Sequence, residues 1–80
     1  MTHTILRLPA ILTSTGLSRS TIYLRIAQGV YTKPVSLGGR AVGWPASEVA
    51  ALNAARIAGK SNAEICDLVV KLEAARKTAA

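Results

Sequence analysis

The sequence predicts a mainly α-helical fold with a small β-hairpin, a winged helix-turn-helix followed by a C-terminal helix. Three observations favour it. Two short helical patterns flank a turn that contains glycine, a hairpin pattern centred on glycines follows, and a third helical pattern comes directly after the hairpin. Aromatic residues make up only 4% of the 80 residues, so the core has to be aliphatic, and a chain of this length has only a small core.

The first two helices are marked by their ends. Apolar residues at three- and four-residue spacing indicate a helix over residues 8–15, and Gly16 supplies the left-handed residue that stops it. Ser18 is a good N-cap for a second helix over residues 19–28, which Gly29 closes. Two short helices joined by a tight turn with glycine are typical of a helix-turn-helix.

The next segment predicts a hairpin, the wing. Lys33-Pro34 prevents a helix, and Gly38-Gly39 supplies the positive φ angles that a tight turn requires, with Arg40 at its tip. Pro45 then opens a third helix that runs to about residue 58. The apolar residues on either side of the turn alternate, so that four of them can share one face: Val35, Leu37, Val42 and Trp44.

A fourth helix is predicted from Asn62 to about Lys77. Ser61 and Glu64 form a capping box at its start. Its apolar residues repeat at coiled-coil spacing: Ile65, Leu68, Leu72 and Ala75. We therefore expect residues 1–59 to form the winged domain, and residues 60–80 to form a helix that either packs on this domain or mediates self-association.

The charge distribution favours a polyanionic partner, double-stranded DNA. The net charge is +6, and all four acidic residues lie at or after Glu48. A long segment without carboxylates is what a phosphate-facing surface needs, because each carboxylate would offset a cation. Five cations precede Glu48: Arg7, Arg19, Arg25, Lys33 and Arg40.

Other classes of protein lack support in the sequence. Cys66 is the single cysteine, which excludes a disulfide framework and a Cys/His metal cluster, so we expect no metal and no cofactor. The single histidine, His3, lies near the N-terminus, and no nucleophile has a base near it in sequence, so we expect no enzyme activity. No apolar run reaches the length of a membrane span or a signal peptide. We expect a bacterial cytoplasmic protein that joins the nucleoid when bound to DNA.

The second helix is the candidate recognition helix. Ile22 and Ile26 would pack on the first helix, and the N-terminal end of such a helix meets the base edges. Leu24 would contact a thymine methyl group or pack against the wing or a neighbouring subunit, while Arg25 would reach a phosphate or cover the core with its stem. The expected contacts from this helix are Ser18, Arg19, Ser20, Thr21, Tyr23, Leu24 and Arg25.

The wing is the second candidate contact. Arg40 at the tip would carry a guanidinium to the DNA backbone or the minor groove, and Lys33 would add non-specific attraction. Trp44 is expected in the core, between the wing and the third helix. The expected contacts from the wing are Lys33, Gly38, Gly39 and Arg40.

These residues also carry a resemblance. The runs 17–23, 33–35, 37–44 and 47–49, together with Gly29, resemble the AlpA family of phage and mobile-element regulators, within the wider group of excisionase and MerR-like winged helix-turn-helix domains. The resemblance covers about residues 5–58 and assigns no role to residues 61–80. The resemblance implies a function in a prophage or integrative element. The protein would be either a transcriptional regulator of excision genes or an excisionase, a recombination directionality factor that bends DNA and recruits an integrase.

The sequence is also compatible with a second class of function. The same scaffold could serve as a protein-interaction adaptor that does not bind DNA. If the chain does bind DNA, one small domain makes too little specific contact for tight site choice. We therefore expect repeated sites with cooperative assembly, or a homo-oligomer.

Overall fold

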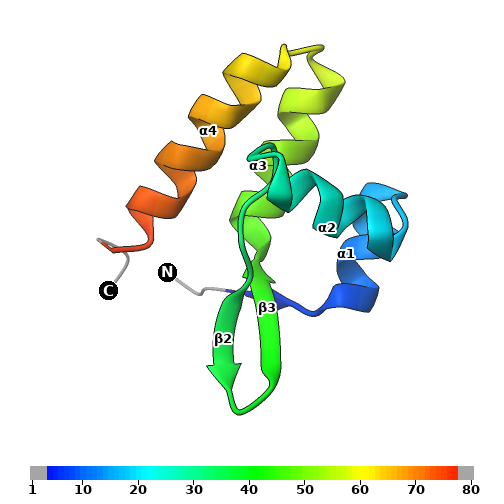
Figure 1. Ribbon diagram of the computed structural model, residues 1–80, viewed down its shortest axis with the longest axis vertical. Helices are drawn as coiled ribbons and strands as arrows, with labels where there is room; N and C mark the ends of the chain where they lie inside the picture. Colours follow the sequence, from blue (N-terminus) through cyan, green and yellow to red (C-terminus); the bar gives the residue numbers. More distant parts are fainter. Residues whose placement is uncertain (1–3, 78–80) are drawn as a thin grey trace.

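The structure, a computed structural model, describes residues 4–77, so His3 lies outside the described residues. In Figure 1 the hairpin projects beyond the helices at the bottom of the view, and α3 and α4 form a second pair of helices above it. The elements follow in the order β1 (Ile5–Leu6), α1 (Leu8–Thr15), α2 (Arg19–Ala27), β2 (Val35–Gly38), β3 (Ala41–Pro45), α3 (Ala46–Ile57) and α4 (Asn62–Ala75).

The predicted winged helix-turn-helix with an added C-terminal helix is confirmed. Gly16 adopts a φ of 70° after α1, and the Ser18 side chain accepts a hydrogen bond from the Thr21 amide at 3.3 Å. The capping box of Ser61 and Glu64 is present at the start of α4. The ends differ by one or two residues from those expected: α2 ends at Ala27, α3 begins after Pro45, and α4 ends at Ala75.

The sheet has a third strand that the sequence did not predict. β1 pairs antiparallel with β3, with Ile5 opposite Pro45 and Leu6 opposite Trp44, so the strand order is β1-β3-β2. The amide of Ala46 also donates to the carbonyl oxygen of Thr4 at 2.7 Å. A strand of two residues is too short to show an alternating pattern, and it forms only because β3 supplies its hydrogen-bond partners.

The expected shared face of the hairpin is wrong in part. Ser36 pairs with Val42 and Val35 pairs with Gly43, because a bulge at Leu37 shifts the register next to the turn. Since residues directly opposite each other share a face, Val35 lies on the face away from Val42 and Trp44. Without the inserted residue, the predicted arrangement would have followed from the two-residue turn.

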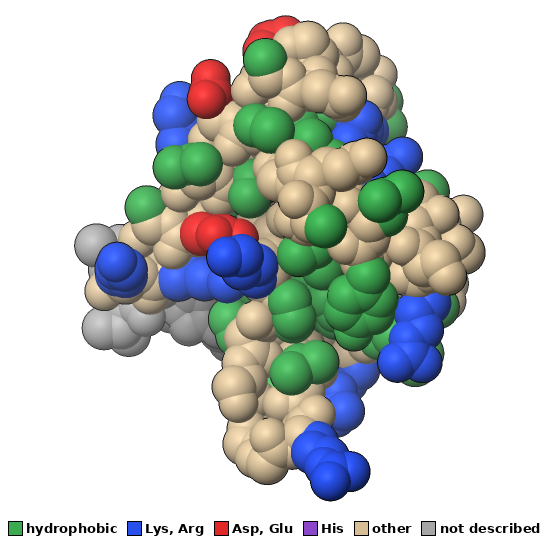
Figure 2. Space-filling view, viewed as in Figure 1, with side chains coloured by type: hydrophobic (Ala, Val, Ile, Leu, Met, Phe, Trp, Pro, Cys, Tyr) green, Lys and Arg blue, Asp and Glu red, His purple; other side chains and the backbone are tan. Residues whose placement is uncertain are grey.

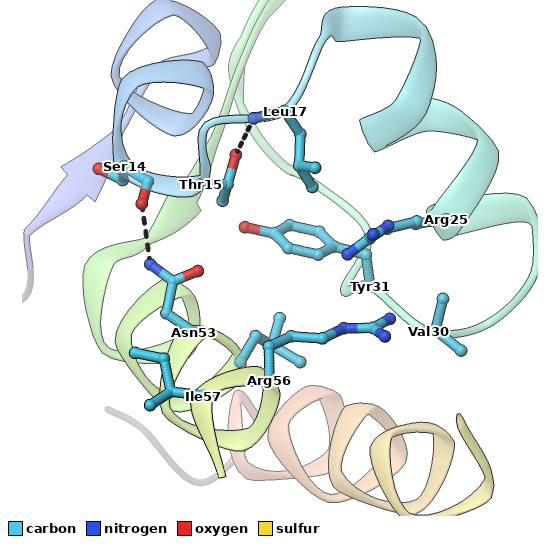
Figure 3. A pocket seen from close by; sticks show the side chains of 10 residues that line it. Ser14, Thr15, Leu17, Arg25, Val30, Tyr31, Asn53, Arg56 and Ile57 are labelled. Atoms are coloured by element: carbon cyan, nitrogen blue, oxygen red, sulfur yellow. Dashed lines mark hydrogen bonds between the residues drawn. The ribbon is translucent and has the colours of Figure 1, made fainter. Parts of the chain in front are cut away.

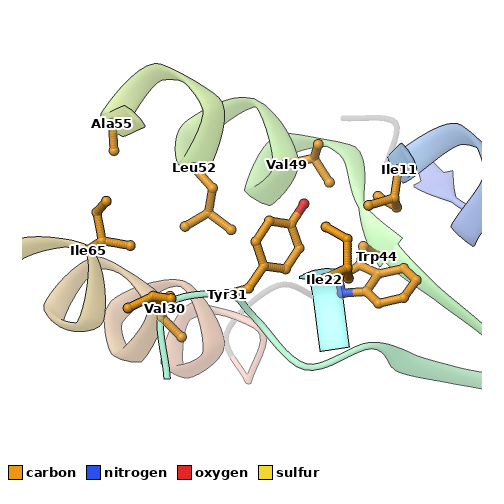
Figure 4. Close-up of a cluster of buried hydrophobic side chains, with 10 residues drawn as sticks. Ile11, Ile22, Val30, Tyr31, Trp44, Val49, Leu52, Ala55 and Ile65 are labelled. Carbon is orange, nitrogen blue, oxygen red and sulfur yellow. The ribbon is translucent and has the colours of Figure 1, made fainter. Parts of the chain in front are cut away.

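The core lies between the sheet, α1, α2, α3 and α4 (Figure 4). Trp44 is fully buried, as predicted, and its indole Nε1 donates a hydrogen bond to the Thr32 carbonyl oxygen at 2.9 Å. Most of the core is aliphatic, as the composition requires. Its buried hydrophobic residues are Ile11, Ile22, Val30, Tyr31, Trp44, Val49, Leu52, Ala55, Ile65 and Val69.

Helix α4 packs on the rest of the chain, one of the two roles expected for it. Ile65 and Val69 are buried against the core, and Leu68 and Leu72 pack partly against it. Near the end of α4, Glu73 accepts a hydrogen bond from the Lys33 amide at 2.9 Å. The division into a domain and an appended helix after residue 59 stays a prediction.

Candidate DNA-binding surface

Helix α2 turns one face to the core and the other to solvent. Ile22 is fully buried and Ile26 packs partly against the core, as their spacing predicts. On the opposite side Tyr23 is 41% exposed and Leu24 is 56% exposed. More than half of the Leu24 side chain is therefore open to a partner.

The start of α2 is held by two of the predicted site residues. The Ser18 hydroxyl accepts from the Thr21 amide, and the two hydroxyl groups lie 2.9 Å apart within hydrogen-bond distance. These side chains are thus engaged in capping the helix. The amides at the N-terminal end of a helix have no partner inside the helix and form a natural site for a phosphate. Arg19 and Ser20, both exposed, occupy this end.

Arg19 and Tyr23 form a pair on the exposed side of α2. The guanidinium carbon of Arg19 lies 6.0 Å from the centroid of the Tyr23 ring, within the range of a cation–π interaction. This contact restricts the long arginine side chain and keeps its charge next to the tyrosine. One helical turn therefore presents a cation and an aromatic hydroxyl together.

The wing ends in the glycine turn that the sequence predicts. Gly38 and Gly39 have φ angles of 105° and 55°, and neither has other atoms within 4 Å of where a side chain would begin. Arg40 follows them at the exposed tip. Figure 2 shows basic side chains at this tip and beside α2 on the same face, with hydrophobic side chains between them.

Lys33 stands apart from this group. It precedes β2, at the end of the strand away from the tip, and its backbone is bound by α4. The carbonyl oxygen of Lys33 accepts a hydrogen bond from Arg76 at 2.6 Å, while its side chain is exposed. The wing residues Gly38, Gly39 and Arg40 therefore lie together, and Lys33 lies at the opposite end of the strand.

Arg25 also turns away from the exposed face of α2. Its side chain lines a pocket between α2 and α3 together with Tyr31 and Arg56. Of its two expected roles, this placement fits the one beside the core. Sequence reasoning missed the other pocket residues, because no local pattern connects Arg56 or Asn53 on α3 with Arg25 on α2.

The surface around α2 and the hairpin has no exposed carboxylate from the first half of the chain. Residues 4–47 contain no acidic residue, and Glu48 is only 4% exposed. Arg76 binds both Glu48 oxygens, with its Nε at 2.7 Å and an Nη at 2.6 Å. The hydrogen bonds to Glu48 raise the pKa of Arg76, so its guanidinium stays charged. The acidic side chains visible in Figure 2 lie toward α4.

The described part of the chain offers no metal centre. Within residues 4–77 no three His, Cys, Asp or Glu residues are grouped so as to hold a metal ion. No helix in the same range is long and apolar enough to cross a membrane.

Comparison with known proteins places this sequence in a family. The sequence matches the family model described as "Prophage CP4-57 regulatory protein (AlpA)" over residues 4–57, from the start of the sheet to the end of α3. A relative from Enterobacteria phage P4, "Uncharacterized protein ORF88", is 53% identical over 55 residues; the match covers 69% of this chain and 62% of the relative, less than two thirds of that protein. No solved structure matches. The chain belongs to the AlpA family of prophage regulatory proteins.

Proposed function

We propose that this protein is a sequence-specific DNA-binding protein of a prophage or integrative element. Helix α2 enters the major groove, and the hairpin contacts the backbone or the minor groove beside it. The observation that carries this proposal is the exposed face of α2 and the arginine-bearing hairpin tip, on a surface where the first acidic residue, Glu48, is buried and paired.

Each exposed residue has a distinct task in this complex. Arg19 binds a guanine edge or a phosphate, and Tyr23 binds a phosphate beside it. Leu24, more than half exposed, contacts a thymine methyl group. Ser18 and Thr21 act by holding the end of α2, so that its free amides face a phosphate.

The tip of the wing contributes charge and close approach. Arg40 carries a guanidinium to the backbone or into the minor groove, where the negative potential is strongest. Gly38 and Gly39 leave room for the duplex, because neither has a side chain. Lys33 adds long-range attraction from the root of the hairpin, without a specific contact.

The test uses Arg19→Ala and Arg40→Ala, with Lys71→Ala as the control. Lys71 is an exposed residue of α4, so its substitution removes the same charge away from the proposed interface. DNA selected from a random pool is titrated at several salt concentrations while fluorescence anisotropy is recorded. Arg19→Ala and Arg40→Ala should each weaken binding by about tenfold or more and flatten the salt dependence, because each loses a contact to base or phosphate.

The melting temperature decides between a contact and a structural role. All three variants should melt within a few degrees of the parent chain, because these side chains are exposed. Equal affinities for the three variants would contradict the proposed interface. DNA binding that is absent, or independent of salt, would favour the protein-interaction adaptor instead.

The role on DNA is proposed as excision control, either as an excisionase that recruits an integrase or as a transcriptional regulator of excision genes. Both require adjacent copies on DNA, since one small domain makes few base contacts. Footprinting across an attachment site and a neighbouring promoter distinguishes them. Repeated protected sites beside the attachment site support the excisionase, and protection confined to the promoter supports the regulator.

A further inference from the structure

A pocket of about 340 Å³ lies between the C-terminal end of α1, helix α2 and helix α3 (Figure 3). This volume falls within the range of small-molecule sites, which extends from about 300 to 1,000 Å³. Apolar side chains from three segments contribute to its lining: Leu17, Val30, Leu52 and Ile57. The pocket is distinct from the exposed face of α2 that carries Tyr23 and Leu24.

Two guanidinium groups from different helices line this pocket. Arg25 comes from α2 and Arg56 from α3, and burial together with the charge of Arg25 lowers the pKa of Arg56. Within residues 4–77 neither arginine forms an ion pair with an acidic residue, although Arg56 donates to the Asn62 side chain at 3.4 Å. Two like charges that share a pocket repel each other, and the attraction of a bound anion for both guanidinium groups would offset this repulsion.

The Tyr31 hydroxyl supplies a third polar group. Tyr31 is 4% exposed, and its hydroxyl has no hydrogen-bond partner among the described residues. Figure 3 shows the ring between the two helices, with the hydroxyl directed toward Thr15 and Asn53. Burial, together with the nearby Glu48, raises the pKa of Tyr31 to about 12, so the group is a neutral donor. A buried hydroxyl without a partner is rare in proteins, and a ligand acceptor would satisfy it.

We propose that this pocket binds a small organic anion, a carboxylate or phosphate attached to an apolar body. The anionic group of the ligand binds Arg25 and Arg56, and its apolar body packs on the apolar lining of the pocket. An acceptor atom of the ligand accepts a hydrogen bond from the Tyr31 hydroxyl. Such a ligand joins α2 to α3 and stabilises their relative position. The proposal does not depend on DNA binding, because its groups line the pocket between α2 and α3 and not the exposed face of α2 that carries Tyr23 and Leu24.

The experiment titrates the full chain with phenyl phosphate and with benzoate, followed by ¹H–¹⁵N NMR of the backbone and the arginine Nε–H groups. Inorganic phosphate and benzyl alcohol serve as the controls that carry only the anion or only the ring. At least one organic anion should give saturable shifts, centred on Tyr31, Asn53 and Arg56, in the millimolar range. Both controls should bind about tenfold more weakly, because each lacks half of the recognised chemistry.

Three variants connect the shifts to the proposed groups. Arg56→Gln should weaken binding by about tenfold, because it removes a charged hydrogen bond. Tyr31→Phe should weaken it several-fold without lowering the melting temperature, since the hydroxyl has no partner to lose. Lys71→Gln, at an exposed residue of α4 that does not line this pocket, should leave binding of the organic anion unchanged.

Several results would overturn the proposal. One is the absence of saturable shifts with both organic anions. Another is equal binding of inorganic phosphate and phenyl phosphate, which would show a bare anion site. Unchanged affinity in Arg56→Gln, or shifts confined to the exposed face of α2, would place the ligand elsewhere.

Discussion

Glu48 and Arg76 form a charged pair inside the structure. Glu48 has a side chain that is 5% exposed, and Arg76 also donates to the Lys33 carbonyl oxygen. A buried carboxylate is costly unless it is paired and hydrogen-bonded. This pair removes the first acidic charge from the surface and connects α3, α4 and the root of the hairpin.

Replacing Arg76 with methionine should therefore destabilise the fold by about 3 kcal/mol, because Glu48 is left buried without a cation. Thermal and urea unfolding would measure the loss. Lys77→Met, a change of the same kind at an exposed neighbour, should have almost no effect. The double variant Glu48→Gln with Arg76→Met should recover part of the stability, and no recovery would show that the charge of Glu48 is not the cause.

Ionisation of the Tyr31 hydroxyl should destabilise the folded protein at alkaline pH. Its pKa rises from 10.0 to about 12 in the folded chain, chiefly because burial disfavours the phenolate. The folded state thus holds this proton more tightly than the unfolded state, and the associated stability, complete below pH 10, is lost as the pH rises toward about 12. In a Tyr23→Phe variant, absorbance of the remaining tyrosine should show this midpoint. A midpoint near 10 would indicate that the ring is hydrated.

Helix α4 stabilises the fold because its apolar side is buried against the core. Ile65 is 1% exposed and should cost about 2–5 kcal/mol when replaced by alanine. Val70, on the same helix, is 66% exposed, and Val70→Ala should change stability by less than about 0.5 kcal/mol. Unfolding curves would give both values. If Ile65→Ala left the melting temperature unchanged but altered sedimentation, α4 would instead be a self-association helix.

Across the whole chain, the features that the sequence predicts are those set by residues close together in sequence. The helices and the hairpin depend on local signals, such as the cap at Ser18 and the glycines at the hairpin turn, and these were predicted correctly. The exposed face of α2 also follows from spacing alone. The regular helical period alone therefore predicts that Tyr23 and Leu24 lie at the surface, and both are exposed.

The features that escaped prediction depend on residues distant in sequence. The pairing of β1 needs β3, and the bulge at Leu37 reverses the face of Val35. The pocket needs Arg25 and Arg56 to approach from separate helices. Apolar spacing along α4 is equally suitable for a neighbour in the same chain and for a second copy, so only the tertiary structure distinguishes them.

The contact between Glu48 and Arg76 has a consequence for synthesis on the ribosome. The carboxylate of Glu48 leaves the exit tunnel 28 residues before its guanidinium partner, after the wing has already emerged. Until that partner arrives, the carboxylate is better solvated by water than enclosed in the interior. The nascent chain should therefore delay its final compaction until Arg76 has left the exit tunnel.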